Sequence, residues 1–65
     1  MSIIDQIKQE YMHNSIVMSE LLRNYTDQLS VEEINELLWW SGDDEFMTVT
    51  EDKEIITLEE ANERT

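Results

Sequence analysis

Apolar residues recur at helical spacing through the first 27 positions of the chain. They form a stripe about 100° wide, as in an amphipathic helix that packs one side on a core. No proline or glycine interrupts this segment. We therefore predict a helix over residues 3–27, with Ser2 as its N-cap and Asp5 in the capping-box position. The stripe consists of Ile3, Ile4, Ile7, Tyr11, Met18, Leu21, Leu22 and Tyr25.

This predicted helix is long for its chain. It would measure about 38 Å, whereas a compact protein of this size is about 28 Å across. It must therefore extend beyond the rest of the protein or bend near Asn14 and Ser15. Asn14 lies within the apolar stripe, and Met12 and Ile16 form an apolar pair on the opposite side. A buried asparagine can fix the register of a helix pair. We predict a homodimer that uses Met12, Asn14 and Ile16; the alternative is a hydrated, partly exposed Asn14.

A second helix is predicted over residues 31–40. Ser30 and Glu33 have the spacing of a capping box, and Gly42, the only glycine, suits a left-handed residue at the helix end. We expect this helix to pair with the first as an antiparallel helical hairpin. Its core-facing residues would be Val31, Ile34, Leu37 and Leu38.

After Gly42 the pattern changes from helical to strand-like. Residues 46–50 and 54–57 are rich in β-branched and aromatic side chains and flank a polar segment, which predicts a short β-hairpin. Thr57 then has the position of an N-cap for a short C-terminal helix over residues 58–64.

These elements predict an α+β fold in a single small acidic domain, residues 1–65. The alternative is an all-α chain in which residues 43–57 are irregular. Folding buries only about 60% of the surface of so short a chain, so the isolated monomer would be marginally stable. Self-association or a tightly bound partner would then add stability.

The charge is large and unevenly distributed. The chain has 16 acidic and 4 basic residues, a net charge of −12. Residues 31–65 contain all but four of the acids. Direct binding to nucleic acid requires lysine and arginine at the phosphates, and an interfacial helix requires them at anionic lipid, so both are disfavoured. No signal peptide and no long apolar run is visible, and we expect a cytoplasmic protein.

The residues needed for catalysis are scarce. Cysteine is absent, and a single glycine excludes a glycine-rich phosphate loop. His13, the only histidine, falls on the polar side of the first helix. The acids after Gly42 do not follow the EF-hand pattern, since apolar and threonine residues occupy the alternate positions. We predict no enzymatic activity, no cofactor and no specific metal site.

Protein recognition is the remaining class of function. The expected partner-binding acids are Glu32, Glu33, Glu36, Asp43, Asp44 and Glu45. Trp40 falls between Glu33 and Glu36 in helical phase, and an exposed tryptophan is a typical interface anchor. We predict that this region occupies a basic surface of another protein, foremost a nucleic-acid-binding one. The alternatives are that the acids serve only solubility and that Trp39 and Trp40 complete the core.

In size and acidity the chain resembles small inhibitors encoded by phages and mobile elements, some of which are nucleic-acid mimics. The resemblance lies in composition and implies a non-enzymatic protein-binding module that acts as an inhibitor. The competing hypothesis is a structural or assembly subunit that docks through the first helix, with its acidity serving solubility.

Overall fold

The structure, a computed structural model, describes residues 2–14 and 16–64. It confirms the predicted α+β fold and excludes the all-α alternative. Two turns of 3-10 helix, η1 and η2, lie among the main elements. In chain order these are α1 (Ile3–Asn14), α2 (Met18–Leu22), η1 (Thr26–Gln28), α3 (Val31–Ser41), η2 (Asp43–Glu45), β1 (Met47–Val49), β2 (Ile55–Thr57) and α4 (Leu58–Glu63).

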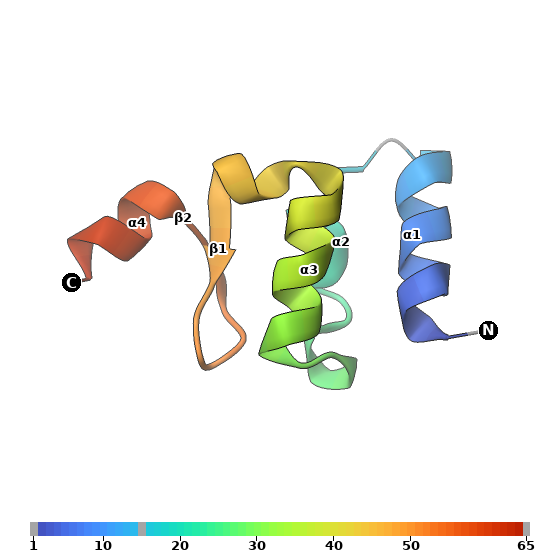
Figure 1. The fold of residues 1–65 in the computed structure, drawn as a ribbon, viewed down its shortest axis with the longest axis horizontal. Helices are drawn as coiled ribbons and strands as arrows, with labels where there is room; N and C mark the ends of the chain where they lie inside the picture. Colours follow the sequence, from blue (N-terminus) through green and yellow to red (C-terminus); the bar gives the residue numbers. More distant parts are fainter. Residues whose placement is uncertain (1, 15, 65) are drawn as a thin grey trace.

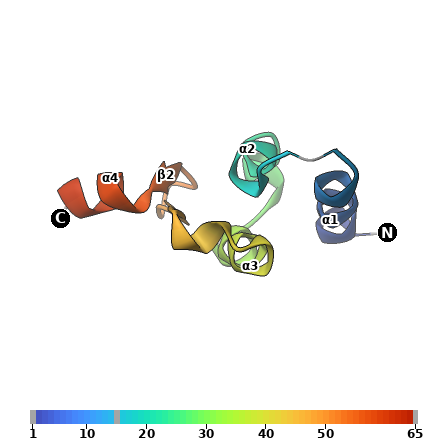
Figure 2. The same ribbon diagram turned by 90° about the horizontal axis from the view of Figure 1, so that it is seen from above.

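The elements lie in a row rather than around a centre. The chain ascends α1, returns through α2 and ascends again along α3, so that these three helices lie together (Figures 1 and 2). The hairpin follows α3, and α4 lies at the end farthest from α1 (Figure 1). The molecule accordingly measures 38 × 21 × 16 Å. None of the helices in the described part of the chain is long and apolar enough to cross a membrane.

The continuous helix predicted over residues 3–27 is wrong, and the alternative of a bend near Asn14 is confirmed. Helix α1 ends at Asn14, Val17 has extended backbone angles, and α2 begins at Met18; Ser15 lies outside the described residues. The physical reason is burial. A straight helix would extend past its small core, whereas the fold back brings Met18, Leu21 and Leu22 into contact with the same core as Ile7. The predicted two-helix hairpin is thus a group of three helices.

The core lies between the three helices and the hairpin. All of the buried apolar residues on α1, α2 and α3 belong to the faces that the sequence predicts, while the hairpin adds Ile55. Burial of this kind contributes about 1.5–3 kcal/mol for each large apolar side chain. The core cluster consists of Ile7, Met18, Leu21, Leu22, Leu29, Ile34, Leu37, Leu38 and Ile55.

The predicted caps at Ser2, Ser30 and Gly42 are confirmed, whereas the first helix does not continue to residue 27. The Ser2 hydroxyl accepts a hydrogen bond from the Asp5 N–H at 3.3 Å. Ser30 and Glu33 form a complete capping box, with bonds of 2.8 and 3.2 Å. Gly42 ends α3 with φ +88°, a left-handed conformation that glycine adopts without steric cost.

The hairpin is antiparallel, with Thr48 opposite Ile56 in the centre of its register. Its turn closes through the Lys53 N–H, which donates to the Thr50 carbonyl at 3.0 Å, and the Thr50 N–H, which donates to the Glu54 carbonyl at 2.9 Å. This is a three-residue loop with a left-handed residue at its end. That residue is Lys53, with φ +66°, where glycine is the usual choice.

Candidate interaction surface

One face of α3 points away from the core and carries an acidic and aromatic surface. Helical spacing groups four residues there, and all four are exposed, in contrast to the buried Ile34, Leu37 and Leu38 on the opposite face. Trp39 retains 70% of its accessible surface. We call this the α3 outer face: Glu32, Asn35, Glu36 and Trp39.

The segment that follows α3 in the chain carries more exposed acids. Gly42 turns the chain into η2, where Asp44 and Glu45 are exposed. Phe46 follows directly and is 69% exposed. The turn is held by the Phe46 N–H, which donates to the Asp43 carbonyl at 2.9 Å. Two exposed aromatic side chains therefore flank, along the chain, a segment of exposed carboxylates.

Two of the acids that the sequence nominates for a partner also hold the fold together. The Asp43 carboxylate accepts a hydrogen bond of 2.9 Å from the N–H of Ser19 in the first turn of α2. Val17, the N-cap of α2, provides no side-chain bond, so Asp43 supplies the cap from 24 residues away. Glu33 is half-buried and closes the capping box of Ser30. The nominated acids that are exposed are Glu32, Glu36, Asp44 and Glu45.

Trp40 lies against α1 rather than standing alone among carboxylates. Its ring meets Tyr11 edge-on at 5.7 Å between centroids. The Lys8 ammonium lies 5.1 Å from the Trp40 centroid, within the range of a cation–π interaction. These contacts leave 39% of Trp40 exposed. The more exposed tryptophan is Trp39 rather than Trp40, the predicted anchor.

A sequence signal for Trp39 did exist. It lies three residues after Glu36 and seven after Glu32, a spacing that puts all three on one helix face. Trp40 lies on the same side of α3 as Glu33, as the helical phase predicts, but α1 packs on that side of α3. The tertiary packing of α1, rather than the phase of α3, therefore decides which indole is covered.

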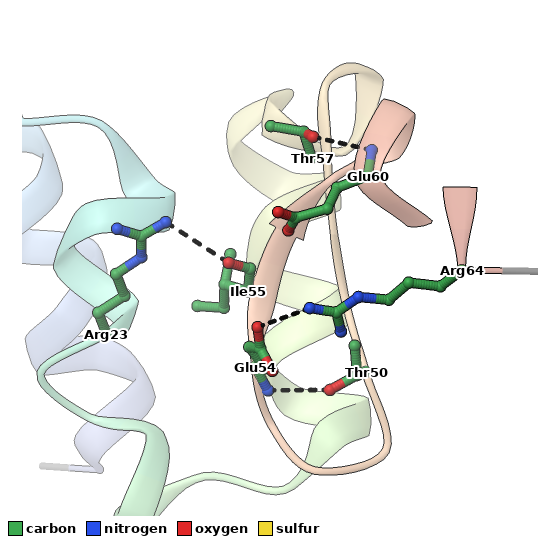
Figure 3. A network of polar contacts seen from close by, with 7 residues as sticks. All are labelled: Arg23, Thr50, Glu54, Ile55, Thr57, Glu60 and Arg64. Atoms are coloured by element: carbon green, nitrogen blue, oxygen red, sulfur yellow. Dashed lines mark hydrogen bonds and ion pairs between the residues drawn. The ribbon is translucent and has the colours of Figure 1, made fainter. Parts of the chain in front are cut away.

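The basic residues lie elsewhere. Arg23 reaches from the end of α2 to the Ile55 carbonyl at 3.4 Å, and Arg64 pairs with Glu54 at 3.1 Å (Figure 3). Within the described residues this is the only ion pair. The bond to Glu54 raises the pKa of Arg64. Arg23 also borders an open hollow of about 390 Å³, lined by Arg23, Thr26, Lys53, Glu54, Ile55, Ile56 and Glu60.

The residues predicted for self-association are partly accessible. Met12 is 72% exposed, and Asn14 is exposed in the single chain, so both are accessible to a second copy. Ile16 is half-buried and packs on the core. Together with Val17 they surround the α1–α2 junction, where a shallow hollow of about 410 Å³ is lined by Tyr11, Met12, Ile16, Val17 and Asp43.

One further polar contact joins α1 to the segment before η1. The Tyr25 hydroxyl donates a hydrogen bond of 2.8 Å to Glu10 Oε2. This bond to a carboxylate, together with desolvation and the negative charge of Glu10, raises the pKa of Tyr25 above its ordinary value of 10.0.

Within the described residues, no three histidine, aspartate or glutamate side chains gather in a way that would hold a metal ion. Comparison of the chain with protein-family models, with curated proteins and with solved structures gives no match. The surface described above is therefore the basis for any functional assignment.

Proposed function

We propose that the protein is a non-enzymatic binding module whose α3 outer face, with Asp44 and Glu45, contacts a basic surface on another protein. The observation that carries the proposal is the exposure of Trp39, 70%, on the same helix face as Glu32 and Glu36. A large aromatic side chain among charged groups is the composition of an interface anchor.

The distribution of charge supports this proposal. Lys8 lies on Trp40, Arg64 pairs with Glu54, and Arg23 and Lys53 line the hollow beside β2. Hence no basic side chain in the described residues forms an ion pair with the α3 outer face. Glu32 and Glu36 are four residues apart, a like-charge spacing that costs about 0.2–0.5 kcal/mol. A cationic partner would relieve this repulsion.

A protein that normally binds nucleic acid is the partner class that we favour. The surface of such a protein must be basic, because it contacts phosphates. An acidic protein bound there would block access of the nucleic acid. The expected role is inhibition in the cytoplasm. Electrostatic steering would make association fast and strongly dependent on salt.

The test compares two variants that remove the same number of charges. One neutralises Glu32, Glu36, Asp44 and Glu45 as Gln or Asn; the control neutralises Glu51, Asp52, Glu59 and Glu63 in the hairpin turn and α4. Each variant changes the net charge of −12 by four units. The probe is octa-arginine, and the measurement is calorimetric Kd at about 50 and about 150 mM salt.

The first variant should bind about fifteenfold more weakly, since four exposed ion pairs at about 0.4 kcal/mol each sum to about 1.6 kcal/mol. The control should stay within about twofold of the wild type. An equal loss in both variants would mean that total charge alone drives binding and that the α3 outer face is a solvated surface.

A second candidate function is assembly through the α1–α2 junction. The exposure of Met12, 72%, and Val17, 51%, beside a shallow hollow favours it. The simplest occupant is a second copy of the chain, as in the predicted homodimer. Met12→Ser is the clean variant, because Ile16 also packs on the core.

Salt separates the two candidates. Copies of net charge −12 repel each other, so a homodimer should strengthen as salt screens them, whereas binding to a basic partner should weaken. Sedimentation of the wild type and Met12→Ser at tens of micromolar tests the dimer. A single species of 7.8 kDa at both low and high salt would rule it out.

A further inference from the structure

Two consecutive tryptophans have opposite environments in this protein. Trp40 packs edge-on against Tyr11 and holds the Lys8 ammonium 5.1 Å from its ring centroid. Trp39 makes neither kind of contact among the described residues, and it is 70% exposed. Trp40 thus already contacts a cation of the protein itself, whereas Trp39 is accessible to a cation of a partner.

The surroundings of Trp39 fit a particular cation. Glu36 lies one helical turn before it and Glu32 two turns before it, and both carboxylates are exposed. Side chains three apart on a helix are neighbours. A group that binds there meets an aromatic face and at least one carboxylate together.

We propose that the α3 outer face selects arginine over lysine: an arginine of the partner protein stacks its guanidinium on Trp39 and donates hydrogen bonds to Glu36. This inference rests on the proposed function and specifies the chemistry of its partner. A guanidinium is planar, weakly hydrated and able to donate two parallel bonds to a carboxylate while it stacks. An ammonium is a compact, strongly hydrated point charge, which loses more of its hydration on an aromatic surface.

Charge complementarity identifies the occupant as a basic segment of a protein, and the aromatic side chain beside a carboxylate favours arginine within that segment. The chain repels nucleic acid and anionic lipid through its net charge of −12. The hollow beside β2 is not an equivalent site, because Glu54 and Glu60 line it together with Arg23 and Lys53. The exposed indole of Trp39 occurs together with Glu32 and Glu36 on the α3 outer face, and neither carboxylate forms an ion pair with a described residue.

The test uses two peptides of equal length and charge, octa-arginine and octa-lysine, with calorimetric Kd values at about 150 mM salt. The wild type should bind octa-arginine about fivefold more tightly than octa-lysine. In Trp39→Ala this ratio should fall to about twofold. The preference that remains comes from the two parallel hydrogen bonds that a guanidinium donates to a carboxylate. Because Trp39 is exposed, the variant should retain the wild-type circular dichroism spectrum.

Phe46→Ala provides the matched control. Phe46 is 69% exposed, as Trp39 is, but lies outside the α3 outer face. This variant should keep the wild-type ratio. If it lowers the ratio as much as Trp39→Ala does, the selectivity belongs to exposed aromatics in general, and the assignment to Trp39 is wrong.

The outcomes separate the inference from the function on which it rests. If both peptides bind, with the same ratio in the wild type and in Trp39→Ala, arginine selection by Trp39 is refuted while the proposed function stands. If neither peptide binds to the wild type, the proposed function itself fails.

Discussion

Replacing Asp43 with alanine should destabilise the protein through loss of the α2 cap. The Asp43 carboxylate accepts the Ser19 N–H at 2.9 Å. Ser19 is buried, and Val17 offers no side-chain substitute. In Asp43→Ala that N–H would lose its partner at the start of a helix only five residues long. The loss should also loosen the link between η2 and α2, two elements far apart in the sequence.

The magnitude follows from the type of bond. Loss of a helix-capping acceptor costs about 0.5–2 kcal/mol, and a half-buried charged acceptor such as Asp43 belongs to the middle of that range. Removal of one of 16 acidic residues relieves some repulsion in return. We expect a net loss of about 1 kcal/mol, or about 4–8 °C in Tm for a protein of this size. Asp43→Asn keeps an oxygen acceptor and should lose less.

The assay is urea denaturation followed by circular dichroism, with Asp44→Ala as the matched control. Asp44 is the next residue, carries the same charge and is exposed. It should change the free energy of unfolding by no more than about 0.5 kcal/mol. Equal stability in the two variants would refute the role of Asp43 as a cap of α2.

Three other predictions follow from the backbone and from one polar contact. Lys53→Gly should stabilise the protein by about 0.5–1 kcal/mol relative to Lys53→Gln in urea denaturation, because φ at this position is +66°; a less stable glycine variant would contradict this. Gly42→Ala should cost about 1 kcal/mol by the same assay, from its φ of +88° alone, since no heavy atom lies within 4 Å of the added Cβ. Tyr25 should ionise above pH 10.0 in an absorbance titration, and Glu10→Gln should lower its pKa. Folding raises the pKa of Tyr25, so its contribution to the free energy of unfolding should be complete below pH 10.0 and lost as the pH rises through the folded-state pKa. The same pH dependence of stability in Tyr25→Phe and in the wild type would contradict this prediction.

The sequence predicts the elements whose signals are local. The capping box at Ser30, the left-handed Gly42 and the strand-like residues 46–50 and 54–57 each depend on neighbours within a few positions, and the structure confirms them. The same holds for the apolar faces that form the core. Short-range hydrogen bonding and the period of the apolar residues are sufficient for these features.

The break between α1 and α2 was predicted near Asn14 only as an alternative to one continuous helix. The cap that starts α2 comes from Asp43, so the signal lies 24 residues beyond the helix that it begins. The apolar period alone supports one long helix, and only the small size of the core opposes it. The preference for a bend therefore comes from tertiary burial, which local patterns do not encode.

The candidate surface was predicted in part. Glu32, Glu36, Asp44 and Glu45 are exposed as a binding role requires, whereas Glu33 and Asp43 also carry capping bonds. The choice between two adjacent tryptophans depends on where α1 packs. Lys8 and Tyr11 meet Trp40, and no feature of α3 by itself indicates that contact.

The two indole N–H groups provide the most direct test of the central claim, that the α3 outer face binds a basic protein surface. Titration of the ¹⁵N-labelled protein with octa-arginine, followed by NMR, reports on Trp39 and Trp40 separately. The account predicts that the Trp39 indole shifts most, together with the amides of Glu32, Glu36, Asp44 and Glu45. The Trp40 indole should move less, because it packs against Tyr11 and Lys8 of α1. Shifts spread evenly over the acids of the hairpin turn and α4, with the Trp39 indole unmoved, would contradict the claim.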